Sequence, residues 1–108
     1  MRTSYRKLVR DRIPEIVAHE GKRAKTRTLG AGEFRNALLK KLLEESKEAH
    51  DAKGKKELVK ELGDVLEVIF ALYCAYNLEP REVESVRRKR RKERGGFEKR
   101  LFLEYIEF

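Results

Sequence analysis

Five carboxylate side chains in the middle of the sequence have the spacing of a metal site. Glu44, Glu45 and Glu48 form one set, and Glu61 and Asp64 form a second set after twelve intervening residues. Within each set the spacing allows a helix to present its acids on one side. Oxygen ligands suit Mg²⁺, with Mn²⁺ as a substitute, and no Cys or His pair has zinc-binding spacing. The acids therefore predict a divalent-metal site.

Apolar residues around these acids recur at helical spacing, which indicates where the acids point. Glu45 falls inside the apolar stripe of residues 34–52, with the other two acids of its set beside the stripe and at its edge. Glu61 lies on the apolar side of residues 58–76, and Asp64 lies just outside it. A buried carboxylate without a partner is costly, so a protein that aims acids inward usually supplies a cation or a proton.

A simpler interpretation treats these acids as ordinary solvated helix residues that pair with lysines. The neighbouring lysines are Lys40, Lys41, Lys47 and Lys60. This interpretation suits any single glutamate. The whole pattern favours metal binding, because two separate segments both place acids on their apolar sides.

Two long helices are needed to position the acids. They are predicted over about residues 33–52 and 55–76, with Gly54 and Asn77 as residues that tolerate a left-handed end. A connection this short makes the helices antiparallel neighbours. The two acidic sets then lie at similar height, each about two turns from the connection, and can surround one or two ions.

The rest of the chain predicts shorter elements around this pair. Residues 4–20 indicate an extended or turn segment followed by a short helix, and residues 21–32 indicate a loop with a brief strand at residues 26–29. A fourth helix is expected from Pro80, and residues 97–108 have the apolar and aromatic character of a terminal strand. We therefore predict a mainly all-α fold, an antiparallel bundle of about four helices with a short C-terminal β segment.

Length and charge limit the classes of function. The 108 residues suffice for one domain (1–108), and 27 Lys and Arg against 19 Asp and Glu give a net charge of +8. This balance favours anionic partners, either nucleic acid or free nucleotides and phosphates. Residues 87–94 contain seven basic side chains and one acid. No phosphate-binding loop or dinucleotide fingerprint occurs, which argues against a Rossmann or P-loop nucleotide fold.

The single cysteine and the absence of a signal peptide indicate a protein of the cytoplasm. Cys74 excludes an internal disulfide and is expected to be a small core residue. The N-terminus lacks the apolar core of a signal peptide, and the longest apolar stretch is interrupted by Glu67. We therefore expect a soluble, cytoplasmic protein that does not associate with membranes.

The acid pattern and its flanking segments resemble a known enzyme family. The motif E-E-x-x-E followed by E-x-x-D is similar to the signature of the all-α nucleoside triphosphate pyrophosphatases, which include MazG, dimeric dUTPases and phosphoribosyl-ATP pyrophosphohydrolase. The segments YRKLVRDRIPEIV, KKLLEESKEA, ELGDVLEVIFAL and ERGGFEKRLFLE resemble a MazG-like subgroup of predicted house-cleaning enzymes. The resemblance covers nearly the whole chain.

This resemblance implies cleavage of a nucleoside triphosphate between the α and β phosphates, releasing the monophosphate and pyrophosphate. It implies that Glu45, Glu48, Glu61 and Asp64 are the metal ligands. Glu44 would bind the metal through water or orient the attacking water, so Glu44 and Glu45 are the expected catalytic residues. It also implies a homodimer or homotetramer.

The basic end of the fourth helix is our candidate for binding the substrate phosphates. The expected phosphate-binding residues are Lys89, Lys92, Arg94, Gly95 and Gly96. Lysine and arginine supply charged donors, and glycines let the backbone approach a phosphate closely. No residue identifies the base, so the substrate could be an oxidised, deaminated, uracil-containing or ordinary nucleotide. Phosphoribosyl-ATP is less favoured, because the sequence shows no second domain of a histidine-pathway enzyme.

Two other classes of function fit parts of the sequence. A nucleic-acid-binding module could use residues 87–94 as a basic arm, with Phe97, Phe102 and Tyr105 stacking on bases. That alternative gives no role to acids on apolar helix faces, so it is not favoured. A metal-stabilised helical scaffold without activity would keep the acids and lack the chemistry.

Overall fold

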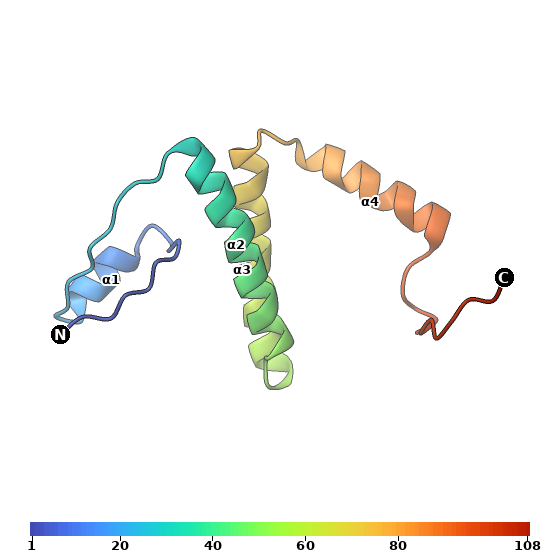
Figure 1. Ribbon diagram of the computed structural model, residues 1–108, viewed down its shortest axis with the longest axis horizontal. Helices are drawn as coiled ribbons and strands as arrows, with labels where there is room; N and C mark the ends of the chain where they lie inside the picture. The colour runs from blue at the N-terminus through green and yellow to red at the C-terminus, as the bar shows by residue number, and fades with distance from the viewer. The chain divides into compact units, whose positions relative to one another are not determined.

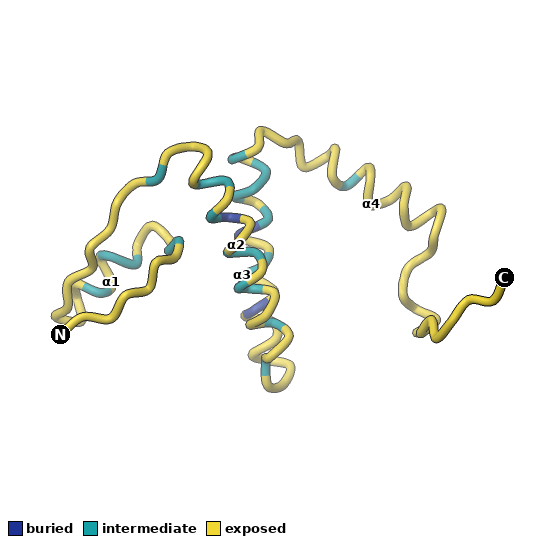
Figure 2. Tube along the Cα trace, in the orientation of Figure 1, coloured by how far each residue is buried: buried dark blue, intermediate teal, exposed yellow.

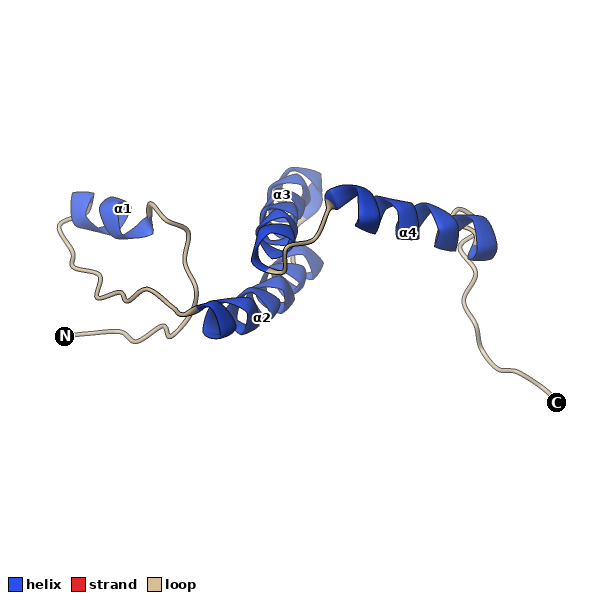
Figure 3. Cartoon of the chain, turned by 90° about the horizontal axis from the view of Figure 1, so that it is seen from above, coloured by secondary structure: helices blue, strands red, loops and turns tan.

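The computed structural model describes residues 1–108 as four helices and no strand, as Figure 3 shows. The helices are α1 (Ile13–His19), α2 (Ala31–His50), α3 (Gly54–Ala75) and α4 (Pro80–Arg94). The all-α class is confirmed. The chain divides into two compact units, Met1–Asn77 and Leu78–Phe108, which are described separately.

Helices α2 and α3 form the antiparallel pair that organises the first unit. Only Asp51, Ala52 and Lys53 separate them, and they lie side by side in both views (Figures 1 and 3). The chain reverses through Gly54, whose φ of +84° is a conformation that side chains disfavour. Asn77, just after α3, has a φ of +54°. The predicted hairpin of two long helices is confirmed, with boundaries that differ by one or two residues.

The contact between the two helices buries few apolar side chains. Leu38 on α2 is 3% exposed and Val68 on α3 is 7% exposed, and no other apolar residue is fully buried. Figure 2 shows the corresponding dark blue segments on this pair. Full burial of such a side chain contributes about 1.5–3 kcal/mol, so two of them make a small core for one unit.

The face of α3 that meets α2 differs from the predicted stripe. The helical spacing of residues 58–76 predicts that Leu58, Leu62 and Val65 point inward; Val65 is partly buried, but Leu62 is 48% exposed and Leu58 is also exposed. Val68 and Glu61 are the buried residues of this helix. They are seven residues apart, about two turns, so both lie on the same side of α3. The buried side of this helix therefore includes Glu61 itself.

The N-terminal segment is a bent, extended run followed by α1. Pro14 lies in the first turn of α1, where its missing N–H is harmless, and Gly21 follows the helix with a φ of +77°. These features agree with the prediction. The strand expected at residues 26–29 is wrong, since the loop before α2 has no strand partner in the chain.

The second unit contains α4 and the C-terminal residues. Pro80 lies in the first turn of α4, and Gly95 ends the helix with a φ of +85°. The terminal strand predicted at residues 97–108 is wrong, because the segment has no strand to pair with, and its side chains, such as Phe97, are exposed.

Two further predictions concern exposure. Cys74 is exposed, so the prediction that it is a core residue is wrong; it is six residues after the buried Val68, which places it on a different side of α3. None of the four helices combines the length and the apolar character needed to cross a membrane.

Candidate metal centre

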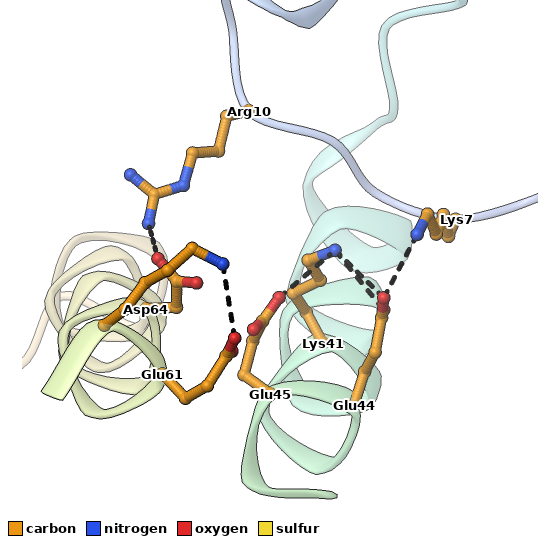
Figure 4. Close-up of polar contacts among 8 residues, drawn as sticks. Lys7, Arg10, Lys41, Glu44, Glu45, Glu61 and Asp64 are labelled. Carbon is orange, nitrogen blue, oxygen red and sulfur yellow. Dashed lines mark hydrogen bonds and ion pairs between the residues drawn. The ribbon is translucent and has the colours of Figure 1, made fainter. Parts of the chain in front are cut away.

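Three carboxylates from the two long helices come together between α2 and α3. Glu45 comes from α2, and Glu61 and Asp64 come from α3. One oxygen of each lies within 4.8 Å of the corresponding oxygens of the other two. Figure 4 shows Glu45 and Glu61 facing each other across the helix pair, with Asp64 on the same side. The antiparallel hairpin thus brings both acidic sets to one level.

The geometry and chemistry of this cluster fit a divalent cation. Two oxygens on opposite sides of an ion, each about 2.1–2.4 Å from it, are separated by about 4.2–4.8 Å. The observed separations do not exceed that range. All three donors are carboxylate oxygens, the type preferred by Mg²⁺, Ca²⁺ and Mn²⁺. The cluster could therefore hold one such ion without rearranging the helices.

Burial makes an unpaired charge costly at this cluster. Glu61 is 7% exposed, although it is a carboxylate, and the side chain of Glu45 is 14% exposed. Lys60 Nζ donates a hydrogen bond of 3.3 Å to Glu61 Oε1. That hydrogen bond, together with the charges of Glu61 and Asp64, raises the pKa of the Lys60 ammonium. The buried glutamate thus has one cation as a partner, and that lysine is itself mostly exposed.

Glu44 lies next to the cluster and is paired with lysines. Lys7 Nζ is 3.2 Å from Glu44 Oε1, and Lys41 Nζ is 3.3 Å from both oxygens. Burial alone would raise the pKa of the Glu44 carboxyl, but the hydrogen bonds from Lys7 and Lys41 outweigh burial and lower it. Glu44 is therefore ionised at neutral pH.

Glu48 is the predicted metal ligand that the structure does not bring into the cluster. It is exposed, and it is absent from the set of three oxygens that lie within 4.8 Å. Its position three residues after Glu45 places it on the same side of α2, one turn closer to the connection with α3.

Two basic residues of the N-terminal segment reach the acids, and sequence reasoning missed both. Lys7 bonds to Glu44, and Arg10 Nη2 lies 2.8 Å from Asp64 Oδ1 (Figure 4). Neither residue has a role predicted from the sequence, and both remain partly exposed. The available signal was the spacing of two cations on either side of Leu8 and Val9, both partly buried.

The five predicted phosphate-binding residues lie in the second unit. Lys89, Lys92 and Arg94 are on α4, followed by Gly95 and Gly96. Lys89 pairs with Glu93 at 3.9 Å. A Cβ at Gly96 would collide with the Arg91 guanidinium and the Glu98 carboxylate, which bond to each other at 2.6 Å. Both groups are the ends of flexible side chains that can shift, so this clash alone does not require glycine at position 96.

Comparison with known proteins identifies the family. A family model described as phosphoribosyl-ATP pyrophosphohydrolase matches residues 5–91. Searches of curated proteins and of solved structures found no match. The matched range contains all five acids and both N-terminal cations, and members of this family are hydrolases of acid anhydrides that typically depend on a divalent metal. The chain belongs to the phosphoribosyl-ATP pyrophosphohydrolase family, within the MazG-like NTP pyrophosphatase superfamily.

Proposed function

We propose that the protein is a cytoplasmic, Mg²⁺-dependent nucleoside triphosphate pyrophosphohydrolase. It cleaves between the α and β phosphates to give a nucleoside monophosphate and pyrophosphate, and its role is to remove non-canonical nucleotides. The observation that carries this proposal is the convergence of Glu45, Glu61 and Asp64 within 4.8 Å. Family membership supports the reaction type.

The acids divide into ligands and a water-orienting group. Glu45, Glu61 and Asp64 would hold the metal, and Glu48 would be the fourth ligand. Glu44 accepts a hydrogen bond from the attacking water. Its lowered pKa makes it a weak base, so we assign it to orienting water more than to removing a proton. A bound divalent ion supplies charge neutralisation and activation of water.

The basic end of α4, in the second unit, is a separate candidate for binding phosphates. Lys89, Lys92 and Arg94 are exposed, and seven of the eight residues at positions 87–94 are basic. Charge-assisted hydrogen bonds from such groups suit an anionic triphosphate. Gly95 and Gly96 follow directly, but Gly95 N donates a 2.7 Å hydrogen bond to Arg91 O, so Gly96 is the glycine proposed to offer its backbone N–H to a phosphate.

We also propose that the protein assembles as a homodimer, in which α2 and α3 pack against their copies. Apolar side chains line the sides of these helices that remain exposed. They are Leu39, Leu43, Val59, Leu62, Leu66 and Phe70, each between 44% and 72% exposed. The four on α3 are spaced three or four residues apart and form one stripe. Covering this stripe would enlarge a core that is small in one chain.

Phosphoribosyl-ATP is the second candidate substrate, because the matching family model carries that description. Both substrates contain a phosphate chain attached to a nucleoside, and both reactions release pyrophosphate. The acids would bind the metal and orient water in the same way for either substrate. The pocket for the base would therefore determine which substrate is used.

A substrate panel tests the proposed reaction. The purified protein is incubated with Mg²⁺ and ordinary, deaminated, oxidised and uracil-containing triphosphates, together with phosphoribosyl-ATP, and pyrophosphate and orthophosphate are measured separately. We expect Mg²⁺-dependent release of pyrophosphate from at least one compound. Inactivity on the whole panel, combined with salt-sensitive binding to oligonucleotides, would instead support a basic nucleic-acid-binding arm.

A further inference from the structure

The acids around the candidate metal centre are matched by an equal number of cations. The four acids are Glu44, Glu45, Glu61 and Asp64, and the four cations within 4.0 Å of them are Lys7, Arg10, Lys41 and Lys60. Apart from the exposed Glu48, the local charge is therefore balanced with no metal present. A divalent ion placed among these acids would leave an excess of positive charge.

Two of these cations come from the N-terminal segment, not from the helices. Lys7 and Arg10 lie 37 and 54 residues from their partners in the sequence. Between them, Leu8 and Val9 are partly buried. Arg6 has a φ of +47°, which bends the chain before Lys7, and Ile13 N donates a 3.1 Å hydrogen bond to Arg10 O. The segment is thus shaped to present both cations to the acids.

The two N-terminal cations are more able to change partners than the lysine on α2. The side chains of Lys7 and Arg10 are 43% and 57% exposed, whereas that of Lys41 is 15% exposed. Long, partly exposed basic side chains reorient at small cost, because a surface ion pair contributes little to stability. Lys41 is confined between Glu44 and Glu45.

We propose that Lys7 and Arg10 neutralise Glu44 and Asp64 in the metal-free protein and move to the substrate phosphates once a divalent ion binds. This inference rests on the proposed function of the same acids. Metal entry makes the two cations redundant at the carboxylates, and an anionic phosphate chain restores the charge balance by accepting their hydrogen bonds. Metal and phosphate consequently bind with positive coupling.

The double variant Lys7→Gln, Arg10→Gln tests this exchange by two binding measurements. The probes are Mn²⁺ alone and imidodiphosphate, a pyrophosphate analogue without a base that resists hydrolysis, titrated into Mn²⁺-saturated protein. We expect the variant to bind Mn²⁺ about two- to fivefold more tightly, because two competing cations are gone. We expect it to bind imidodiphosphate about tenfold or more weakly, because charge-assisted hydrogen bonds are lost.

The matched control removes the same charge from positions that do not touch the acids. Arg12→Gln, Lys22→Gln alters cations that pair only with Glu15 and Glu20. This control should leave both affinities within about twofold of the wild type, because distant exposed charges are screened by salt. If both double variants change the two affinities equally, the loss of net charge explains the effect, and the proposal is overturned.

A purely structural role for the two cations predicts different results. If they only fix the N-terminal segment on α2 and α3, the variant would bind Mn²⁺ more weakly and imidodiphosphate with unchanged affinity, which overturns the exchange. The single variants Lys7→Gln and Arg10→Gln are measured in the same way if the double variant melts below the assay temperature. A wild-type protein that binds no Mn²⁺ contradicts the proposed function as well. If the wild type binds Mn²⁺ and the variants have its affinities for Mn²⁺ and imidodiphosphate, only the exchange is contradicted.

Discussion

Replacing Glu61 with glutamine is expected to lower the rate of pyrophosphate release by about 100-fold or more. Loss of a group that only supports a metal ligand typically costs 10–100-fold, so loss of a ligand should cost at least as much. Glu61 is the most buried acid of the cluster and one of the three that converge within 4.8 Å. The assay measures Mg²⁺-dependent pyrophosphate release from the best substrate of the panel.

The control for this variant is Glu67→Gln, which makes the same change at an exposed position of α3 outside the cluster. It should retain wild-type activity. Glu61→Gln should not melt at a lower temperature than the metal-free wild type, because an amide of the same shape replaces a buried charge. If Glu61→Gln retains activity within threefold of the wild type, or if Glu67→Gln loses as much activity, the assignment of Glu61 as a metal ligand is contradicted.

Replacing Leu66 with lysine is expected to weaken the proposed homodimer by about 100-fold or more. Leu66 is 51% exposed in one chain and lies in the middle of the apolar stripe of α3. Full burial of a leucine contributes about 1.5–3 kcal/mol, about half of Leu66 is already covered in one chain, and each dimer contains two copies, so about 1.5–3 kcal/mol of apolar burial is lost, and burying two lysine charges adds further cost. Sedimentation velocity over a range of micromolar concentrations measures the dissociation constant.

The matched control places lysine at Glu57, an exposed polar position on the same helix. Glu57→Lys should sediment as the wild type does. A wild-type protein that is monomeric throughout the concentration range would contradict the homodimer, as would a Leu66→Lys variant with an unchanged dissociation constant. The second outcome would place any dimer contact on another surface.

The helices were predictable because their signals are local. Pro14 and Pro80 lie in first turns, and Gly21, Gly95 and Asn77 adopt positive φ values close to where α1, α4 and α3 end. The antiparallel pair followed from the shortness of its connection. These features depend on a few neighbouring residues, so they can be read without knowing the packing.

The acidic cluster was only partly predictable, because a helix cannot direct all of its acids to one point. Consecutive residues differ by about 100° around the helix axis, so Glu44 and Glu45 cannot share one direction. Glu45 faces α3, while Glu44 turns toward Lys7 and Lys41. The alternative of lysine-paired acids also holds in part, because Lys41 and Lys60 do pair with acids of the cluster.

Two errors have a common origin in contacts that the sequence pattern does not contain. Residues 97–108 have strand-like composition, but a strand needs a partner and the chain provides none. The roles of Lys7 and Arg10 depend on contacts across 37 and 54 residues. Periodicity reports which side of an element is apolar, whereas long-range pairing depends on the packed structure.

Mn²⁺ titration followed by electron paramagnetic resonance tests most directly whether the acids of α2 and α3 hold the metal. The signal of free Mn²⁺ is recorded for the wild type and for Glu45→Gln, Glu61→Gln and Asp64→Asn, with Mg²⁺ as competitor. We predict that the wild type binds Mn²⁺, that Mg²⁺ displaces it, and that each variant binds it at least about tenfold more weakly. Variants that bind Mn²⁺ as tightly as the wild type would contradict the metal site.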